Sequence, residues 1–235
     1  MHIGLLQADR HDINIEQQFG TYSDMFQQLF HQADSDVNFT TYQVIDSKYP
    51  ESINECDGYL ITGSKESVYD KQPWIESLRK FVVDISHQES KLVGICFGHQ
   101  LIADALGGKV EKSKNGWGVG VTSSLVTEPN SWMVPPKQKF SLLVSHQDQV
   151  VKLPDGAICF ADNEFCPYSG YRIGRKILSF QGHPEFTVDY LKNRMLLRKK
   201  LYGEKLYNDA FDSLKNDTQH LEIAKWILNF FNEEK

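Results

Sequence analysis

Short apolar runs alternate with longer amphipathic stretches over the first half of the chain. Apolar runs of about four to eight residues are typical of buried strands, and apolar positions recurring every three to four residues are typical of helices. The predicted strands cover residues 3–7, 39–44, 59–62 and 92–95, and the predicted helices cover residues 20–32, 73–88 and 97–106. This β-α-β-α order with apolar strands predicts a parallel sheet that helices cover on both faces.

The pattern changes after Gly107-Gly108, where shorter β-type runs are separated by turn sequences such as Asn115-Gly116 and Gly174-Arg175. Closely spaced strands joined by tight turns indicate antiparallel pairing. We therefore predict an α/β fold whose parallel sheet carries an added antiparallel portion. The length of 235 residues suits one core, and neither a repeat nor a Pro/Ser-rich linker divides the chain. Residues 1–235 are expected to form a single domain.

The C-terminal part contains two more predicted helices and an irregular region between them. One helix is expected to begin near Thr187, and the last one follows Asp217-Thr218, which we expect to cap it. Residues 202–219 form the most irregular region and are expected to be a surface excursion. The final helix is predicted from apolar residues at helical spacing: Leu221, Ala224, Ile227, Leu228 and Phe231.

Composition and charge limit the classes of protein to consider. Hydrophobic residues make up 40% of the chain but form no long apolar run, so we expect no membrane span. The N-terminus enters a strand-like run without a basic region and an apolar core, so a signal peptide is not expected. The formal net charge of −6 argues against a nucleic-acid surface. The short cluster Arg198-Lys199-Lys200 is interpreted as a solvated helix face.

The four cysteines favour a reducing compartment. They form no Cys-x-x-Cys pair and have no histidine at metal-ligand spacing, so neither a metal site nor a disulfide framework is predicted. We therefore expect a cytoplasmic protein. Cys56 and Cys159 lie near apolar runs and are interpreted as structural, whereas Cys166 precedes Pro167 and is expected in a loop.

Cys96 carries the most informative chemistry. It follows the strand-like run 92–95 and has a glycine two residues to either side, Gly94 and Gly98. This spacing is typical of a nucleophile elbow, in which a sharp strand-to-helix turn holds the nucleophile beside the N–H of the next residue. Cys96 is therefore predicted to attack a carbonyl carbon. The alternative for such a cysteine is a small buried apolar residue.

A base for that attack is available in Gly182-His183-Pro184-Glu185. The imidazole of His183 can accept the thiol proton, and Glu185 can fix the tautomer and stabilise the imidazolium. This Cys-His-Glu set predicts acyl transfer through a thioester. The alternatives are that His183 is a surface loop residue and that Glu185 caps the helix near Thr187.

Four blocks in this order carry a family resemblance: residues 57–68, the Cys96 elbow, residues 145–150 and residues 181–185. The chain resembles class I glutamine amidotransferases, in particular the stand-alone proteins related to the glutaminase domain of GMP synthetase. The resemblance extends from residue 3 to about residue 185. It implies a flavodoxin-like, mostly parallel sheet with an antiparallel addition. It also implies that Cys96, His183 and Glu185 are nucleophile, base and orienting acid in hydrolysis of the glutamine side-chain amide.

The same resemblance implies an oxyanion hole. Its donors would be a backbone N–H in the loop that holds Gly63 and Ser64, together with the N–H of Phe97. Two such donors aimed at the developing charge supply the electrostatic stabilisation that usually dominates this chemistry. The family often has two glycines followed by proline here, whereas this chain has Gly63-Ser64-Lys65. The alternative for Ser64 is an ordinary strand-to-helix turn.

Substrate contacts are also implied by the resemblance. Gln100, Ser145, His146 and Gln147 correspond to positions that bind the α-amino and α-carboxylate ends of glutamine. The family often has glycine at the position of Gln147. Alternatively, Gln100 faces solvent and residues 145–147 form only a polar loop. Two further candidates stay open: Asp148 for the substrate amine or for loop stability, and Asp9 or His11 for a ligand contact from the loop after the first strand.

Several functions are compatible with this set of residues. The first is a glutaminase that passes ammonia to a separate synthetase subunit, because the chain has no Gly-rich phosphate loop of its own. The second is a γ-glutamyl peptidase or hydrolase that acts on glutathione-like compounds. The others are an inactive regulatory or binding module and a flavin or nucleotide binder, although the latter lacks a dinucleotide fingerprint. The expected partner is a small-molecule substrate, and no cofactor is implied.

Overall fold

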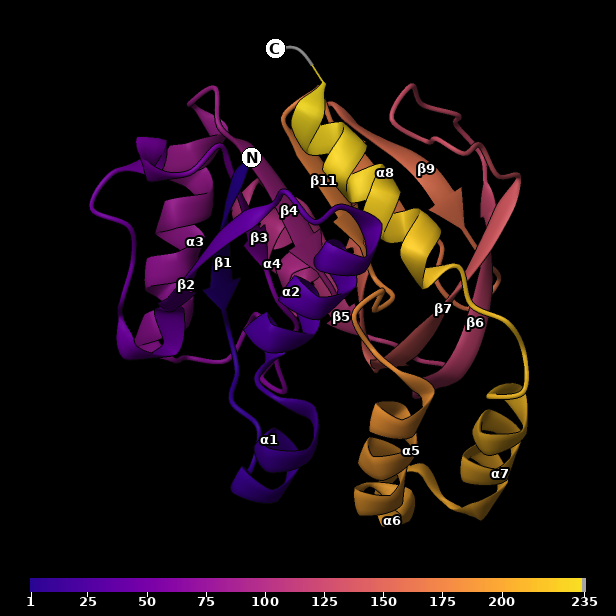
Figure 1. Ribbon diagram of the computed structural model, residues 1–235. Helices are drawn as coiled ribbons and strands as arrows, with labels where there is room; N and C mark the ends of the chain where they lie inside the picture. Colours follow the sequence, from indigo (N-terminus) through magenta and orange to yellow (C-terminus); the bar gives the residue numbers. More distant parts are fainter. Residues whose placement is uncertain (234–235) are drawn as a thin grey trace.

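A computed structural model describes residues 1–233 and contains one large mixed sheet (Figure 1). Its nine strands follow the order β2-β1-β3-β4-β11-β10-β9-β6-β7, and β5 pairs with β8 in a separate two-stranded ribbon. The strands are β1 (His2–Gln7), β2 (Asn38–Gln43), β3 (Gly58–Ile61), β4 (Lys91–Ile95), β5 (Lys109–Lys112), β6 (Gly118–Val126), β7 (Lys139–His146), β8 (Asp148–Lys152), β9 (Ala157–Asp162), β10 (Gly170–Ile173) and β11 (Ile177–Phe180).

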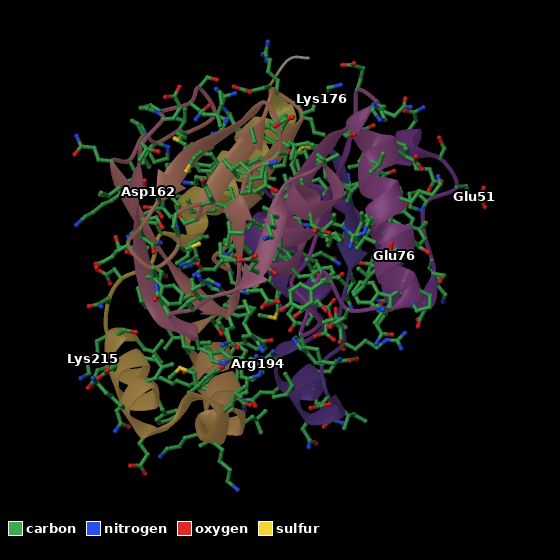
Figure 2. All side chains as sticks on the ribbon, turned by 180° about the vertical axis from the view of Figure 1, so that it is seen from behind. Glu51, Glu76, Asp162, Lys176, Arg194 and Lys215 are labelled. Carbon is green, nitrogen blue, oxygen red and sulfur yellow. The ribbon has the colours of Figure 1, made fainter. Side chains whose placement is uncertain are left out.

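The sheet has a parallel half and an antiparallel half. Strands β2, β1, β3, β4 and β11 pair in parallel, whereas β10, β9, β6 and β7 add antiparallel pairs. In the reverse view, Glu76 on the parallel side and Asp162 at the end of β9 lie on opposite sides of the molecule (Figure 2). The α/β fold with a parallel core and an antiparallel portion is therefore confirmed.

Helices cover both faces of the sheet. Buried side chains of α2 and α8 pack on one face of β1, β3 and β4, and those of α3 and α4 pack on the other. The remaining helices lie near the carboxyl ends of the parallel strands (Figure 1). The helices are α1 (Ile13–Phe19), α2 (Tyr22–Ala33), α3 (Pro73–Ser86), α4 (Phe97–Ala105), α5 (Val188–Leu197), α6 (Lys199–Tyr202), α7 (Glu204–Ser213) and α8 (His220–Asn232), with 3₁₀ turns at Val44–Asp46 and Ile53–Glu55.

Most predicted elements lie within one or two residues of the observed ones. Residues 202–219 lie mostly at the surface, as predicted, but the segment is not irregular, because it contains α7. This helix packs on β6 through buried Ala210 and a hydrogen bond from the Val121 N–H to Ser213 Oγ (2.9 Å). The predicted cap at Asp217-Thr218 is also wrong: α8 begins after Gln219 without a side-chain cap. Thr187 does cap α5, since its side chain accepts the N–H of Tyr190.

Three further properties concern the described residues. Within residues 1–233, no helix combines the length and the apolar character needed to cross a membrane. Nor do these residues include a group of three or more His, Cys, Asp or Glu side chains that could hold a metal ion. All four cysteines are free thiols.

Candidate active site

Cys96 occupies a strained turn between β4 and α4. Its backbone has φ 52° and ψ −98°, a conformation that L-residues adopt rarely, as expected for a nucleophile elbow. The flanking Gly94 and Gly98 do not have a positive φ themselves. They are needed because α4 lies very close to β3 and β4 at these positions. A Cβ at Gly94 would lie 2.6 Å from the backbone of Gly98, and one at Gly98 would lie 2.5 Å from the Ile61 carbonyl oxygen. Only glycines let α4 start this close to β3 and β4.

His183 and Glu185 form a buried pair beside this turn. The Nδ1 of His183 lies 2.7 Å from Glu185 Oε1, and both side chains are almost inaccessible. The imidazole stacks on Phe186 with ring centroids 3.7 Å apart and an angle of 8°. The His183 N–H also donates to the Leu143 carbonyl oxygen (2.9 Å), so strand β7 helps to position the loop. The alternatives of a surface histidine and of a helix-capping glutamate are therefore wrong.

The charge of His183 depends on these neighbours. Burial acts to lower the pKa of His183, but the negative charges of Glu185 and Cys96 and hydrogen bonds to both side chains raise the pKa to about 10. Because Nδ1 is bonded to Glu185, Nε2 is the ring nitrogen left for Cys96. The predicted nucleophile, base and acid are thus brought together, in an arrangement that favours an imidazolium beside the sulfur.

Backbone N–H groups surround the same point. Phe97 is the first residue of α4, and within the described residues no backbone carbonyl accepts its N–H. Gly63 lies against the other side of the imidazole, since a Cβ there would lie 2.8 Å from His183 Cε1. Ser64 follows and lines the same cavity as Cys96. The three residues predicted for an oxyanion hole therefore flank the thiol and the imidazole.

A cavity of about 200 Å³ opens above Cys96. All four residues predicted to contact substrate line this cavity, and so does Asp148. It is lined by Ser64, Lys65, Glu66, Ser67, Cys96, Gln100, Lys112, Trp117, Ser145, His146, Gln147, Asp148 and Arg198.

The predicted substrate residues differ in how they are held. Gln100 is only 3% exposed and donates through Nε2 to the Asp148 carbonyl oxygen (2.7 Å) and to Gln181 Oε1 (3.0 Å), so the solvent-facing alternative is wrong. His146 is buried and bonds through Nδ1 to the same carbonyl oxygen (3.0 Å). Burial lowers the pKa of His146 to about 4, which keeps this ring neutral. Ser145 Oγ lies 3.2 Å from the Tyr202 hydroxyl.

Asp148, Asp9 and His11, whose roles the sequence leaves open, also have defined contacts. The carboxylate of Asp148 accepts hydrogen bonds from the hydroxyls of Ser67 (2.5 Å) and Tyr69 (2.9 Å), which join the loop after β3 to the start of β8. Neither Asp9 nor His11 lines the cavity. His11 bonds instead to the Gly20 carbonyl oxygen and to the Tyr190 hydroxyl, both at 2.8 Å.

One wall of the cavity was not predicted from the sequence. Lys199 and Lys200 are exposed, as expected for a solvated face, but Arg198 lines the cavity. Its guanidinium carbon lies 5.8 Å from the centre of the Trp117 ring. Lys112 lines the same cavity. Within residues 1–233, neither cation has a carboxylate partner within 4.0 Å. No local pattern marks these residues, because separate segments bring them together.

Comparison with known families agrees with this geometry. The family model described as "Glutamine amidotransferase class-I" matches residues 19–201. The chain belongs to this family. A glutamine amidotransferase-like protein of Schizosaccharomyces pombe is 30% identical, with 99% of each chain covered. This class I glutamine amidotransferase is also 27% identical to gamma-glutamyl peptidase 2 of Arabidopsis thaliana, over 93% of this chain and 92% of that one.

One further relative and one solved structure are also similar to this chain. A glutamine-hydrolyzing GMP synthase subunit of Archaeoglobus fulgidus is 27% identical, with 74% of this amidotransferase chain and 94% of the other covered. The crystal structure of a glutamine amidotransferase from Thermotoga maritima superposes with a TM-score of 0.78 at 19% identity, covering 99% of this chain and 100% of that one. At this identity the superposition shows a shared fold.

Proposed function

We propose that this protein hydrolyses a γ-glutamyl amide through a thioester on Cys96. The observation that carries the proposal is the buried His183–Glu185 pair at 2.7 Å, whose free ring nitrogen serves the sulfur at the floor of an open cavity. A nucleophile, a base and an orienting carboxylate in this relation are the requirements of cysteine acyl transfer.

The reaction would follow from these positions. The sulfur of Cys96 attacks the γ-carbonyl carbon, and the N–H groups of Ser64 and Phe97 stabilise the oxyanion. The C–N bond then breaks, and the leaving amine takes its proton from Nε2 of His183. Water attacks the thioester, His183 accepts a proton from it, and the C–S bond breaks to release glutamate. The net change is one water consumed, with one glutamate and one amine formed.

Glutamine is the first candidate substrate, with ammonia as the leaving group and a synthetase on a separate chain as its acceptor. The likeness to a glutamine-hydrolyzing GMP synthase subunit supports this assignment. Gln100, Ser145, His146 and Gln147 would bind the amino-acid end of glutamine, because all four line the cavity that contains Cys96.

A larger γ-glutamyl compound is the second candidate, and one observation favours it. The wall formed by Lys112, Trp117 and Arg198 offers two cations and an aromatic ring to a leaving group. Ammonia needs none of these contacts, whereas an amine that carries a carboxylate would benefit from them. The likeness to gamma-glutamyl peptidase 2 agrees with this candidate.

Glutamate release from glutamine, glutathione and a γ-glutamyl anilide tests the proposal, with Cys96→Ala as the blank. Turnover of any of the three that is absent in Cys96→Ala would support the thioester mechanism. Substantial release by Cys96→Ala would rule out Cys96 as the nucleophile. No turnover of any substrate would favour a partner-dependent site or an inactive module.

Arg198→Ala separates the two candidates, with Lys200→Ala as the matched control on an exposed neighbour. If Arg198 binds a carboxylate on the leaving group, kcat/KM for glutathione should fall about tenfold while that for glutamine stays within about twofold. Equal effects on both substrates would instead assign Arg198 to the glutamyl end that they share.

A further inference from the structure

Asp9 is a buried carboxylate at the end of β1 that the mechanism above does not use. It is 4% exposed, and it does not line the cavity. Its Oδ2 accepts the backbone N–H of Lys65 (3.0 Å), and its Oδ1 accepts the Arg10 N–H (2.8 Å) and the Lys65 ammonium (2.9 Å). A buried carboxylate is expensive unless it is satisfied in this way.

The bond to the Lys65 N–H acts on the loop that flanks the thiol. The N–H of Lys65 belongs to the peptide plane that follows Ser64, so fixing it limits the rotation of Ser64. A second tether holds the other side of this residue. Thr62 Oγ1 accepts the Ala8 N–H (3.0 Å) and donates to the Gly63 carbonyl oxygen (3.1 Å). Both sides of Ser64 are therefore tied to the segment that leaves β1.

We propose that Asp9 is a positioning residue that holds the loop 63–65 so that the Ser64 N–H faces the oxyanion. The inference rests on the proposed function, because it assigns that N–H to the oxyanion hole. Asp9 itself does not touch substrate. A carboxylate suits this task because hydrogen bonds to a charged acceptor are stronger than those to a neutral one.

The hydrogen bond from the Lys65 backbone N–H to Asp9 positions the loop, and the ion pair with the Lys65 ammonium does not. The Lys65 side chain is 56% exposed, so solvent screens its ammonium. The hydrogen bond that the Lys65 ammonium donates to Asp9 raises the pKa of Lys65, which agrees with a formed pair but does not orient the loop. Lys65→Met keeps the N–H and loses only the ammonium. Exchange of the residue 65 amide in this variant should therefore stay within about twofold of that in the original protein.

The decisive variant is Asp9→Ala, measured beside Asp9→Asn and the control Asp46→Ala. Loss of a whole oxyanion donor costs about 10²–10³ in kcat, so a loosened donor should cost at least about tenfold, with KM within about twofold. Asp9→Asn retains a side-chain oxygen for the Lys65 N–H and should recover most of kcat. Asp46 pairs with Arg10 outside the loop, so Asp46→Ala should leave kcat unchanged.

Amide hydrogen exchange at Lys65, followed by NMR, tests the tether independently of turnover. Exchange should be at least about tenfold faster in Asp9→Ala than in the original protein, because the amide loses its acceptor. Alkylation of Cys96 by iodoacetamide should keep its rate, since it needs no oxyanion donor. If Asp9→Ala does not fold, Asp9→Ser provides the same test, because a hydroxyl is too short to reach the Lys65 N–H.

The two proposals fail in different ways. If the unmutated protein releases no glutamate, kcat cannot test Asp9, and exchange at Lys65 alone decides its role. If the protein is active and Asp9→Ala keeps its kcat, Asp9 does not position the loop. Unchanged exchange at Lys65 in Asp9→Ala would overturn the inference in either case.

Discussion

Gly63→Ala should disable the site through a single added methyl group. The new Cβ would lie 2.8 Å from His183 Cε1, about 0.6 Å short of ordinary contact at 3.4 Å. The backbone of Gly63 does not have a positive φ, so alanine is acceptable to the main chain itself. The perturbation therefore acts on the imidazole.

The imidazole has little room to retreat. Its face stacks on Phe186 at 3.7 Å, and Nδ1 is held by Glu185 at 2.7 Å. Either the ring or the loop at Gly63 must shift by about 0.6 Å, and both belong to the proposed machinery. Because a misplacement of about 1 Å can cost about 10² in rate, we expect kcat to fall by about ten- to hundredfold, with a small change in KM.

Steady-state glutamate release measures this effect, and Ser64→Ala is the matched control. Ser64→Ala keeps the backbone N–H and loses only a side-chain bond to the Glu66 N–H (3.2 Å), so its kcat should stay within about threefold. Urea unfolding checks that both variants are folded. A folded Gly63→Ala protein with the original kcat would refute the packing argument.

Two further predictions concern stability. The pKa of His183 is raised above its ordinary value of 6.5 to about 10, so its stabilising contribution is complete below pH 6.5 and is lost as pH rises towards 10. Glu185→Gln should flatten this decline, and equal slopes in urea unfolding at pH 6, 8 and 10 would contradict it. Gln100→Leu should lower the free energy of unfolding by about 2–3 kcal/mol, because it removes the donor to Gln181 and to the Asp148 carbonyl oxygen; an unchanged urea midpoint would contradict this.

The features that could be predicted from the sequence are those that depend on residues close together in the chain. Cys96 between two glycines, and His183 two residues before Glu185, are local spacings, and the structure brings these residues together. Strands β1, β3 and β4 were predictable for a similar reason, since each contains a short apolar run, whereas β2 is partly polar. Helix α7 was not, because it has a mostly polar sequence and buries only the small residue Ala210 fully. Leu206, Tyr207 and Ala210 do recur at helical spacing, but the many charged residues around them made the segment look irregular.

Contacts between distant segments could not be predicted from the sequence, because sequence patterns do not identify side-chain partners. Arg198 and Trp117 meet only because the chain after α5 folds back over the start of β6. The bond between Asp9 and Lys65 joins the ends of β1 and β3, which the sequence placed at one edge of the sheet without giving side-chain partners. Predicting these pairs needs three-dimensional packing and not periodicity.

The attachment of His183 to β7 has a dynamic consequence. β7 is the last strand of the nine-stranded sheet, so β6 is its only partner strand in that sheet, and the isolated β-bridge to His183 is its only other β-pairing among the described residues. Edge ribbons open more easily than central strands, and opening β6 and β7 would release the Leu143 contact that holds the imidazole near Cys96. In mild denaturant, activity should therefore disappear while the parallel half of the sheet is still intact.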